Sequence, residues 1–329
     1  MIRAAIIGLG WWGQTLLKTL SNSTVITPVL GVDPLDTARA RAAALGVETA
    51  PRFEDALANS GVDAVVLCTP QQHHAEQIVA AARSGRHVFC EKPLCTTAAE
   101  AEAAVAAVRN AGVQLGIGHE RRFEPAVIDM RKRFAAGEFG DPLLLEGNFS
   151  QDKFLKLPRD NWRLSDTQNP AGPLSATGIH LVDLSIALLG RPVSVWARLA
   201  ALGSDFANGD TLSITMGFES GATAMLGAVL ATPFMGRLAL LGSKGWMEIR
   251  DRSHPENSTG WDVTRVHRDQ PPVTAFHPPH PAVRDNLEAF GRAALGQAPY
   301  PVALDEMLLN VRSFEAIQRS VKSGAIEKI

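Results

Sequence analysis

The first part of the chain, to about residue 118, alternates short apolar segments with alanine-rich segments that end at a glycine. Runs such as "RAAIIG" and "DAVVLCTP" are each followed by a stretch of helical composition, and Gly46, Gly85 and Gly112 stand where such stretches end. Glycine is common just past a helix because it adopts the left-handed backbone without a steric penalty. Continuous apolar strands are typical of a parallel sheet with helices on both faces. The pattern therefore predicts a doubly wound α/β fold.

The expected helices of this part cover residues 13–20, 36–45, 72–84 and 97–111. From residue 125 onward the pattern changes to an amphipathic helix over 125–136 and then to segments with period-2 alternation, such as "TLSITMGF" and "VSVWARL". Such strands favour an open, mostly antiparallel sheet in an α+β domain. Residues 252–283, rich in Pro, His and Asp, are interpreted as a long irregular loop or arm, and two helices near 285–295 and 304–321 close the chain.

We therefore predict two domains in these 329 residues, a dinucleotide-binding Rossmann domain over residues 1–120 and an α+β substrate-binding and oligomerisation domain over 121–329. The formal net charge of −2 and the scattered basic residues argue against nucleic acid or a membrane surface as a partner. No signal peptide and no bilayer-spanning run are evident. Cys68, Cys90 and Cys95 lack metal-ligand spacing, so reduced thiols and a cytoplasmic location are expected, with no metal.

The first apolar strand runs into a glycine loop of the form G-x-G-x-x-G, whose residues are Gly8, Gly10, Trp11, Trp12 and Gly13. Glycines in this context permit a tight turn, close approach of the backbone to a pyrophosphate and close packing of the helix that follows. The alternative is that the glycines only serve a tight turn. The position of the loop, after a strand and at the start of a helix, favours dinucleotide binding.

An acidic residue, Asp33, stands about 20 residues after Gly13, at the end of the second strand. A carboxylate there accepts hydrogen bonds from both ribose hydroxyls of NAD and repels the 2′-phosphate of NADP. No Arg or Lys follows before Arg39. The sequence therefore predicts NAD as the cofactor, in preference to NADP.

Two further segments, "CTP" and "CEKP", follow later strands and are expected at the carboxyl ends of the sheet, where ligands bind. Pro70 ends its strand, and Pro93 makes the Lys92–Pro93 bond a candidate cis peptide. A lysine close to a positively charged nicotinamide is expected to have a depressed pKa, which suits proton exchange with a substrate hydroxyl. The alternative for Lys92 is a surface ion pair with Glu91.

These segments resemble the glucose–fructose oxidoreductase, inositol dehydrogenase and rhizopine-catabolism family (Gfo/Idh/MocA). The resemblance is carried by "AAIIGLGWWG", "VVLCTPQQHHAEQIVAAARSGRHVFCEKPL" and "GHERRFEPA", and it continues through "NWR", "ATGIHLVDL", "GSKGWMEI" and "VRSFEAIQRSVKSG". It implies a Rossmann domain followed by an α+β domain whose sheet forms a homodimer or homotetramer interface. It also implies nicotinamide-dependent redox chemistry at a carbon that bears a hydroxyl.

The resemblance also implies roles for particular residues. Lys92 is expected to be the catalytic lysine, and Trp162 and Arg163 of "NWR" to approach the nicotinamide or the substrate. The residues expected on the cofactor side are Thr69, Pro70, His74, Glu91 and Lys92.

The segment "SATGIHLVD" departs from the family at one position. Many relatives carry an Asp four residues before the histidine, whereas Ala176 stands there in this chain, with Thr177 as the nearest polar residue. If a helix starts near Thr177 as its N-cap, His180 lies in the first turn, where the helix dipole favours a neutral imidazole. We expect His180 to assist Lys92 in catalysis, and Thr177 to contact the substrate. A hydrogen-bonded core histidine is the alternative, and Asp183 is interpreted as structural.

Arg121 and Arg122 follow the last parallel strand. A guanidinium suits a carboxylate-bearing substrate, so Arg122 is a candidate substrate-binding residue, with interdomain salt bridges as the alternative. Lys153, Arg159 and Arg163 form a second candidate anion pocket around Trp162.

The sequence thus predicts an NAD-dependent oxidoreductase that transfers a hydride between the nicotinamide and a hydroxyl-bearing carbon of a sugar, cyclic polyol or dihydrodiol. Two alternatives remain open. One is a reductase of an aldehyde, keto-sugar or imine, and the other is a nicotinamide-binding regulator without catalytic activity.

Overall fold

The computed structural model describes all residues from 1 to 329, and the chain divides into two compact units. The first unit consists of residues 1–120 and 281–311, and the second of residues 121–280 and 312–329. The sequence-based division placed residues 281–311 in the second domain. They belong to the first unit because Leu287 and Phe290 pack in the same hydrophobic cluster as Ile6 and Leu16.

The first unit is built on a six-stranded, fully parallel sheet with the strand order β3-β2-β1-β4-β5-β6. The strands are β1 (Ile2–Ile7), β2 (Ile26–Val32), β3 (Glu48–Ala50), β4 (Ala64–Leu67), β5 (His87–Cys90) and β6 (Leu115–Ile117). The chain runs outward from β1 to β3 and then returns to add β4 on the other side of β1. This arrangement confirms the predicted doubly wound fold and places a topological switch point between β1 and β4.

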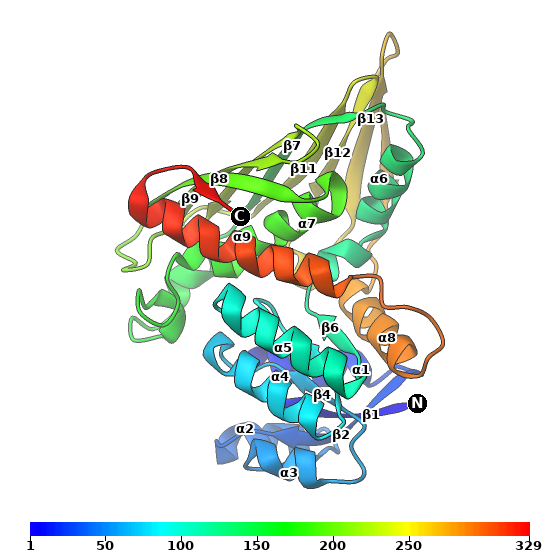
Figure 1. Cartoon of the computed structure of the whole chain (residues 1–329), viewed down its shortest axis with the longest axis vertical. Helices are drawn as coiled ribbons and strands as arrows, with labels where there is room; N and C mark the ends of the chain where they lie inside the picture. The colour runs from blue at the N-terminus through cyan, green and yellow to red at the C-terminus, as the bar shows by residue number, and fades with distance from the viewer. The chain divides into compact units, whose positions relative to one another are not determined.

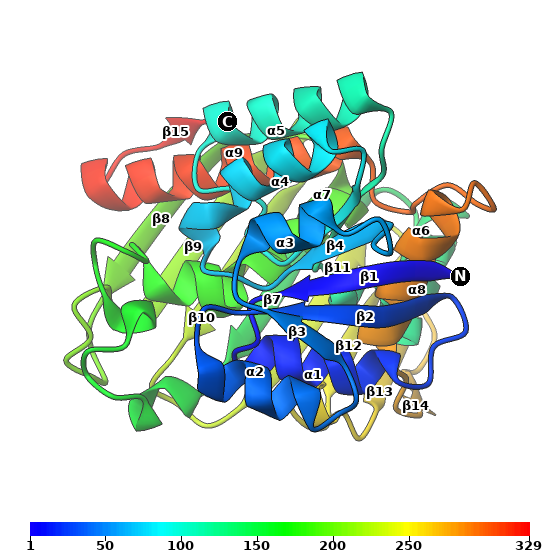
Figure 2. The same cartoon turned by 90° about the horizontal axis from the view of Figure 1, so that it is seen from below.

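Helices cover both faces of this sheet, as Figure 2 shows for α1 and α2 on one face and α3 and α4 on the other. The helices of the first unit are α1 (Trp11–Leu20), α2 (Asp36–Ala43), α3 (Phe53–Ala58), α4 (His74–Arg83), α5 (Ala98–Ala111), α8 (Ala282–Ala294) and the beginning of α9 (Leu304–Ser323). A short 3₁₀ turn, η1 (Gln71–His73), precedes α4. The expected helix over 97–111 is confirmed, with Thr97 accepting a hydrogen bond from Glu100 N and with Gly112 left-handed.

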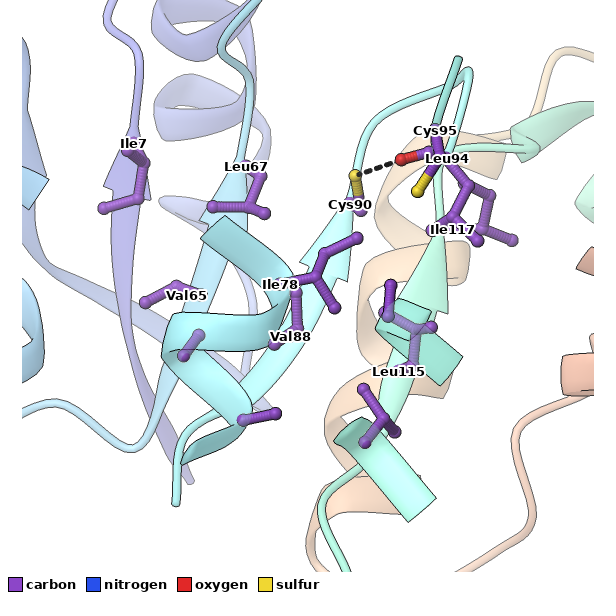
Figure 3. Packing of buried hydrophobic residues seen from close by; sticks show 14 of the residues in the cluster. Ile7, Val65, Leu67, Ile78, Val88, Cys90, Leu94, Cys95, Leu115 and Ile117 are labelled. Atoms are coloured by element: carbon purple, nitrogen blue, oxygen red, sulfur yellow. Dashed lines mark hydrogen bonds between the residues drawn. The ribbon is translucent and has the colours of Figure 1, made fainter. Parts of the chain in front are cut away.

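Two clusters of buried apolar side chains hold the sheet between its helices. Figure 3 shows part of one cluster, in which Ile78 of α4 packs with Val65 and Val88 of the central strands. Each of these side chains is fully buried. Burying one such side chain contributes about 1.5–3 kcal/mol, so the cluster holds α4 firmly against β4 and β5.

The second unit contains a nine-stranded sheet with the order β14-β13-β12-β11-β7-β10-β9-β8-β15. Its strands are β7 (Pro142–Ser150), β8 (Pro192–Ala200), β9 (Thr211–Phe218), β10 (Thr223–Val229), β11 (Met235–Gly242), β12 (Gly245–Asp251), β13 (Trp261–His267), β14 (Val273–His277) and β15 (Glu327–Lys328). All neighbours are antiparallel except β7 and β10. The predicted open, mostly antiparallel sheet is therefore confirmed.

The prediction of an irregular segment over residues 252–283 was wrong for residues 261–277. These form the hairpin β13–β14, which adds two strands at one edge of the sheet, with Val263 paired to Ala275. Trp261 and Val263 are buried while Asp262 between them is not, so the start of β13 has an alternating pattern. Proline and polar residues dominate the composition and hide this pattern, and edge strands tolerate both.

The helices of the second unit are α6 (Pro125–Ala135), α7 (Ile179–Leu189) and the remainder of α9. Figure 1 shows α6 and α7 beside one face of the nine-stranded sheet. The short turns are η2 (Glu120–Phe123), η3 (Lys153–Lys156), η4 (Trp162–Leu164), η5 (Leu174–Gly178) and η6 (Pro255–Asn257). Gly147 of β7 lets Leu181 of α7 approach closely, since a Cβ there would lie 3.1 Å from the leucine Cδ2. No helix of the chain is both long enough and apolar enough to cross a lipid bilayer.

Candidate active site

The glycine loop lies at the switch point of the parallel sheet. Gly8 has a positive φ of 89°, and a Cβ there would lie 2.9 Å from the backbone of Cys68 at the end of β4. A Cβ on Gly13 would collide with the carbonyl oxygen of Gly8, so the start of α1 packs directly on the loop. Gly10 caps α1 without a side-chain hydrogen bond, and a Cβ there would meet nothing within 4 Å. The loop therefore offers open space at a helix N-terminus, which fits a pyrophosphate.

Asp33 follows β2 and is held by the backbone around the loop. Its Oδ2 accepts a hydrogen bond from Leu9 N at 2.8 Å, and its Oδ1 accepts one from Leu35 N at 2.9 Å. Arg39 donates to the Asp33 carbonyl oxygen at 2.7 Å and also pairs with Asp36. The Asp33 carboxylate is thus fixed beside the glycine loop, where it can accept hydrogen bonds from a ribose. The Arg39 guanidinium lies next to this residue.

The loops that follow β4 and β5 are joined by His74. Its Nδ1 lies 2.7 Å from the carbonyl oxygen of Pro93, and its Nε2 lies 2.9 Å from that of Thr69. Burial lowers the pKa of this imidazole, although the two carbonyl groups oppose the shift. Because both ring nitrogens face these carbonyl groups in the buried interior, His74 holds the two loops together, and its expected place on the cofactor side stays a prediction. The Lys92–Pro93 bond is cis, as expected.

Glu91 is the first residue after β5, and its side chain is buried. Desolvation, and next the charge of Glu120, raise the pKa of Glu91 to about 7, while the Trp12 indole and the Lys92 ammonium oppose the shift. Gly118 leaves room for this carboxyl group, since a Cβ on that residue would lie 2.7 Å from Glu91 Cδ. The candidate catalytic lysine therefore follows a carboxyl group that holds its proton near neutral pH. Trp12 faces Glu91, whereas Trp11 is largely exposed.

In the second unit, His180 lies on α7, but another helical turn precedes this helix. A π-helical turn over Leu174–Gly178 leads into α7 without a break, and the Thr177 hydroxyl donates to the carbonyl oxygen of Pro173 at 3.4 Å. The prediction that Thr177 caps the helix was therefore wrong. His180 sits in the second turn of the helical segment, where the dipole argument for a neutral ring no longer applies. Its ring is buried, with its centroid 5.9 Å from that of Phe149.

The two arginines after β6 form buried ion pairs inside the second unit. Arg122 donates from Nε and Nη2 to the two carboxylate oxygens of Asp183, each at 2.7 Å. Arg121 donates to Glu124 at 3.1 Å and to Asp251 at 2.8 Å. The structure therefore shows salt bridges for both arginines, as the alternative interpretation expected. Their partners lie in the second unit, so these salt bridges do not connect two domains. The structural interpretation of Asp183 is confirmed.

Most of the cations that were expected to form an anion pocket around Trp162 are paired with acidic side chains. Lys153 pairs with Glu256, and Arg159 pairs with Asp205. Arg163 stacks over the Trp162 ring, with its Cζ 4.4 Å from the centroid. Burial lowers the pKa of this guanidinium, with no acidic group opposing the shift. One cation of the expected three therefore remains available to a ligand.

Two residues near His180 were not recognised in the sequence. Phe149 of β7 has ring contacts with both His180 and His254, and Arg121 lies over its face at 5.1 Å. The contacts of His254 join residues about 100 positions apart in the chain. The alternation of β7 marks Phe149 as inward-facing, but no local signal marks His254.

A doubly wound parallel sheet with a glycine loop at its switch point defines a dinucleotide-binding protein. Residues 2–119 match the model of the oxidoreductase family with an NAD-binding Rossmann fold, and residues 127–248 match the GFO/IDH/MocA C-terminal domain. The chain therefore belongs to the Gfo/Idh/MocA oxidoreductase family.

Several members of this family are similar to the chain over most of its length. It is 30% identical over 269 residues to scyllo-inositol 2-dehydrogenase (NAD(+)) of Bacillus subtilis, covering 77% of this chain and 75% of that protein. It is 31% identical over 296 residues to D-xylose 1-dehydrogenase (NADP(+)) 2 of Haloferax volcanii, covering 88% of each. The crystal structure of aldose-aldose oxidoreductase from Caulobacter crescentus, complexed with glycerol, superposes with a TM-score of 0.88 at 26% identity, covering 100% of this chain and 99% of that one.

Proposed function

We propose that this protein is an NAD-dependent dehydrogenase that oxidises a hydroxyl-bearing carbon of a sugar or cyclic polyol. The observation that carries the proposal is the fixed Asp33 carboxylate beside an open glycine loop, in a chain that retains Lys92 and His180. The named relatives, which act on inositol and xylose, support the substrate class.

The chemistry divides between the cofactor and the chain. A bound nicotinamide supplies the hydride acceptor. Lys92 takes the proton of the substrate hydroxyl, and His180 orients that hydroxyl. Glu91, protonated in part near pH 7, limits the negative charge beside Lys92. Without an Asp at position 176, Lys92 is the principal proton-transfer group.

The preference for NAD over NADP rests on Asp33, whose carboxylate repels a 2′-phosphate. Arg39 is the nearest cation, but it is held by the Asp33 carbonyl oxygen and by Asp36.

The test of this function is the Lys92→Met variant. We expect it to lose turnover by at least about a thousand-fold with scyllo-inositol, D-xylose or a related polyol, because the proton acceptor is gone. NAD should still bind, as measured by quenching of tryptophan fluorescence. Normal turnover by this variant, or no turnover by the wild type with any compound of the panel, contradicts the proposal.

We also propose that the protein is a cytoplasmic homodimer or homotetramer that associates through the nine-stranded sheet. Supporting this are exposed apolar side chains in one row of that sheet, where Trp196 and Met225 both lie next to Thr215. Light scattering of Met225→Asp tests it, since a charge in that row should shift the mass toward the monomer. The three unpaired cysteines suit a reducing compartment.

A further inference from the structure

Phe149 stands between two imidazole rings in the second unit. Its ring centroid lies 5.9 Å from that of His180 and 5.7 Å from that of His254. Phe234 closes the group, 5.5 Å from His254 and 6.3 Å from Phe149. We refer to these four side chains as the Phe149 cluster. It connects the candidate catalytic histidine to a second histidine through one aromatic ring.

The protonation of His254 follows from its neighbours. Lys153 Nζ lies 3.1 Å from His254 Nδ1, and the backbone N–H of Glu256 donates to the same nitrogen at 3.3 Å. An ammonium group has no lone pair, so Nδ1 must be the acceptor in both contacts. The proton of the neutral ring is therefore on Nε2. Glu256 also pairs with Lys153, which fixes the ammonium in place.

The ring remains neutral at physiological pH. The pKa of His254 falls to about 4, mainly because of desolvation and in part because of the charges of Lys153 and Arg121, whereas Glu256 and Asp251 oppose the shift. His254 therefore presents one permanent N–H donor from Nε2, and no pH change near neutrality alters it.

This donor has no acceptor within the protein. His254 Nε2 is buried and makes no hydrogen bond, and the same holds for Oε1 of Gln151. Gln151 lies two residues beyond Phe149 and two before Lys153, so it belongs to the same end of β7. A buried polar group without a partner costs about 1–3 kcal/mol, which a ligand that supplies the partner recovers.

The charges around the cluster indicate which ligand fits. Arg121 and Lys153 are outnumbered by three carboxylates paired with them, those of Glu124, Asp251 and Glu256. The balance disfavours an anion. A neutral hydroxyl fits, since its oxygen accepts from an N–H without adding a charge. Sugars and cyclitols carry several hydroxyl groups of this kind.

We propose that His254 is a substrate-binding residue whose Nε2–H donates to a hydroxyl oxygen of a neutral sugar or cyclitol bound beside the Phe149 cluster. Lys153 is a positioning residue that holds the imidazole in this tautomer. The assignment rests on the proposed dehydrogenase function and extends it by naming a second contact of the substrate.

The kinetic test compares His254→Phe, which keeps the ring shape without the donor, with His254→Gln, whose amide N–H replaces the donor at Nε2. The substrates are scyllo-inositol, D-xylose and D-glucose, with D-glucuronate as the anionic counterpart of glucose. Lys153→Met tests the tautomer. Arg159→Met, which removes a cation paired elsewhere with Asp205, is its control.

We expect His254→Phe to raise KM about tenfold for the neutral substrate that the wild type uses best, with kcat changed less than about threefold. Tenfold corresponds to about 1.4 kcal/mol, the size of one hydrogen bond. His254→Gln should recover most of the loss, Lys153→Met should raise KM by a smaller factor, and Arg159→Met should match the wild type. An unchanged KM in His254→Phe, no recovery in His254→Gln, or a preference for glucuronate over glucose overturns the proposal.

A second measurement does not depend on turnover. In protein labelled with ¹⁵N-histidine, His254 should show the Nε2–H tautomer between pH 6 and 8, and Lys153→Met should reduce its population. Adding the neutral sugars should shift the Nε2 signal, whereas glucuronate should not. The Nδ1–H tautomer, or an Nε2 signal that no neutral sugar moves, refutes the role of His254. If the wild type turns over nothing while the signal moves, the dehydrogenase function fails and the binding assignment stands.

Discussion

The buried carboxyl group of Glu91 makes the stability of the first unit depend on pH in a specific window. Its pKa rises from an ordinary 4.5 to about 7 in the folded chain, mainly because burial disfavours the charged form. Between these two values the folded state holds a proton that the unfolded state releases. The contribution of this group to stability is therefore fully present below pH 4.5 and is lost as the pH rises through 7.

The size of the effect follows from the shift. One pKa unit corresponds to about 1.4 kcal/mol, so Glu91 should remove about 3 kcal/mol of stability between pH 4.5 and pH 8. Glu91→Gln is neutral at every pH and lacks this loss. The free energy of unfolding of the variant, relative to that of the wild type, should then increase by about 3 kcal/mol as the pH rises from 4.5 to 8.

Urea unfolding at several pH values, followed by tryptophan fluorescence, measures the difference. Titrating groups distant from Glu91 contribute equally to both proteins and cancel, whereas Glu120 and Lys92 interact with Glu91 and are part of the measured effect. Glu48→Gln, which removes an exposed carboxylate from β3, is the matched control and should differ from wild type by less than about 0.5 kcal/mol throughout. Stability curves of Glu91→Gln and wild type that run parallel from pH 4.5 to 8 would refute the reasoning.

Two further predictions concern groups that the structure shows in fixed pairs. Arg122→Met or Asp183→Leu alone should destabilise the chain by about 3–5 kcal/mol, because each leaves an uncompensated buried charge, whereas the double variant should recover much of the loss. Urea unfolding measures this, and additive losses in the double variant contradict it. Asp33→Ser should weaken NAD binding and raise the NADP-to-NAD affinity ratio by about tenfold or more in fluorescence titrations. An unchanged ratio would show that Asp33 does not select the cofactor.

Much of the first unit was predictable because its signals are local. Strand runs, glycines after helices and the spacing from Gly13 to Asp33 each involve neighbours in the sequence, and each is found in the structure. The missed elements, β3 and α3, are too short to carry a period of their own. The cis bond at Lys92–Pro93 was recognised as a candidate because only proline makes it common.

The candidate site was less predictable because its properties depend on distant partners. The carboxylate that neutralises Arg122 comes from α7, and the group that Arg121 pairs with lies at the end of β12. Proton placement on His254 depends on Lys153, about 100 residues earlier in the chain. No spacing rule connects such residues, so the sequence left their roles open.

The sequence by itself determined the class of fold, the dinucleotide loop and the family, because periodicity, backbone freedom and motif spacing are short-range properties of the chain. Only the tertiary structure decided that residues 281–311 return to the first unit and that His74 joins two loops. It also decided that Glu91 holds a proton near neutral pH. Burial and charge at a side chain depend on what surrounds it in space, and the folded chain alone assembles those surroundings.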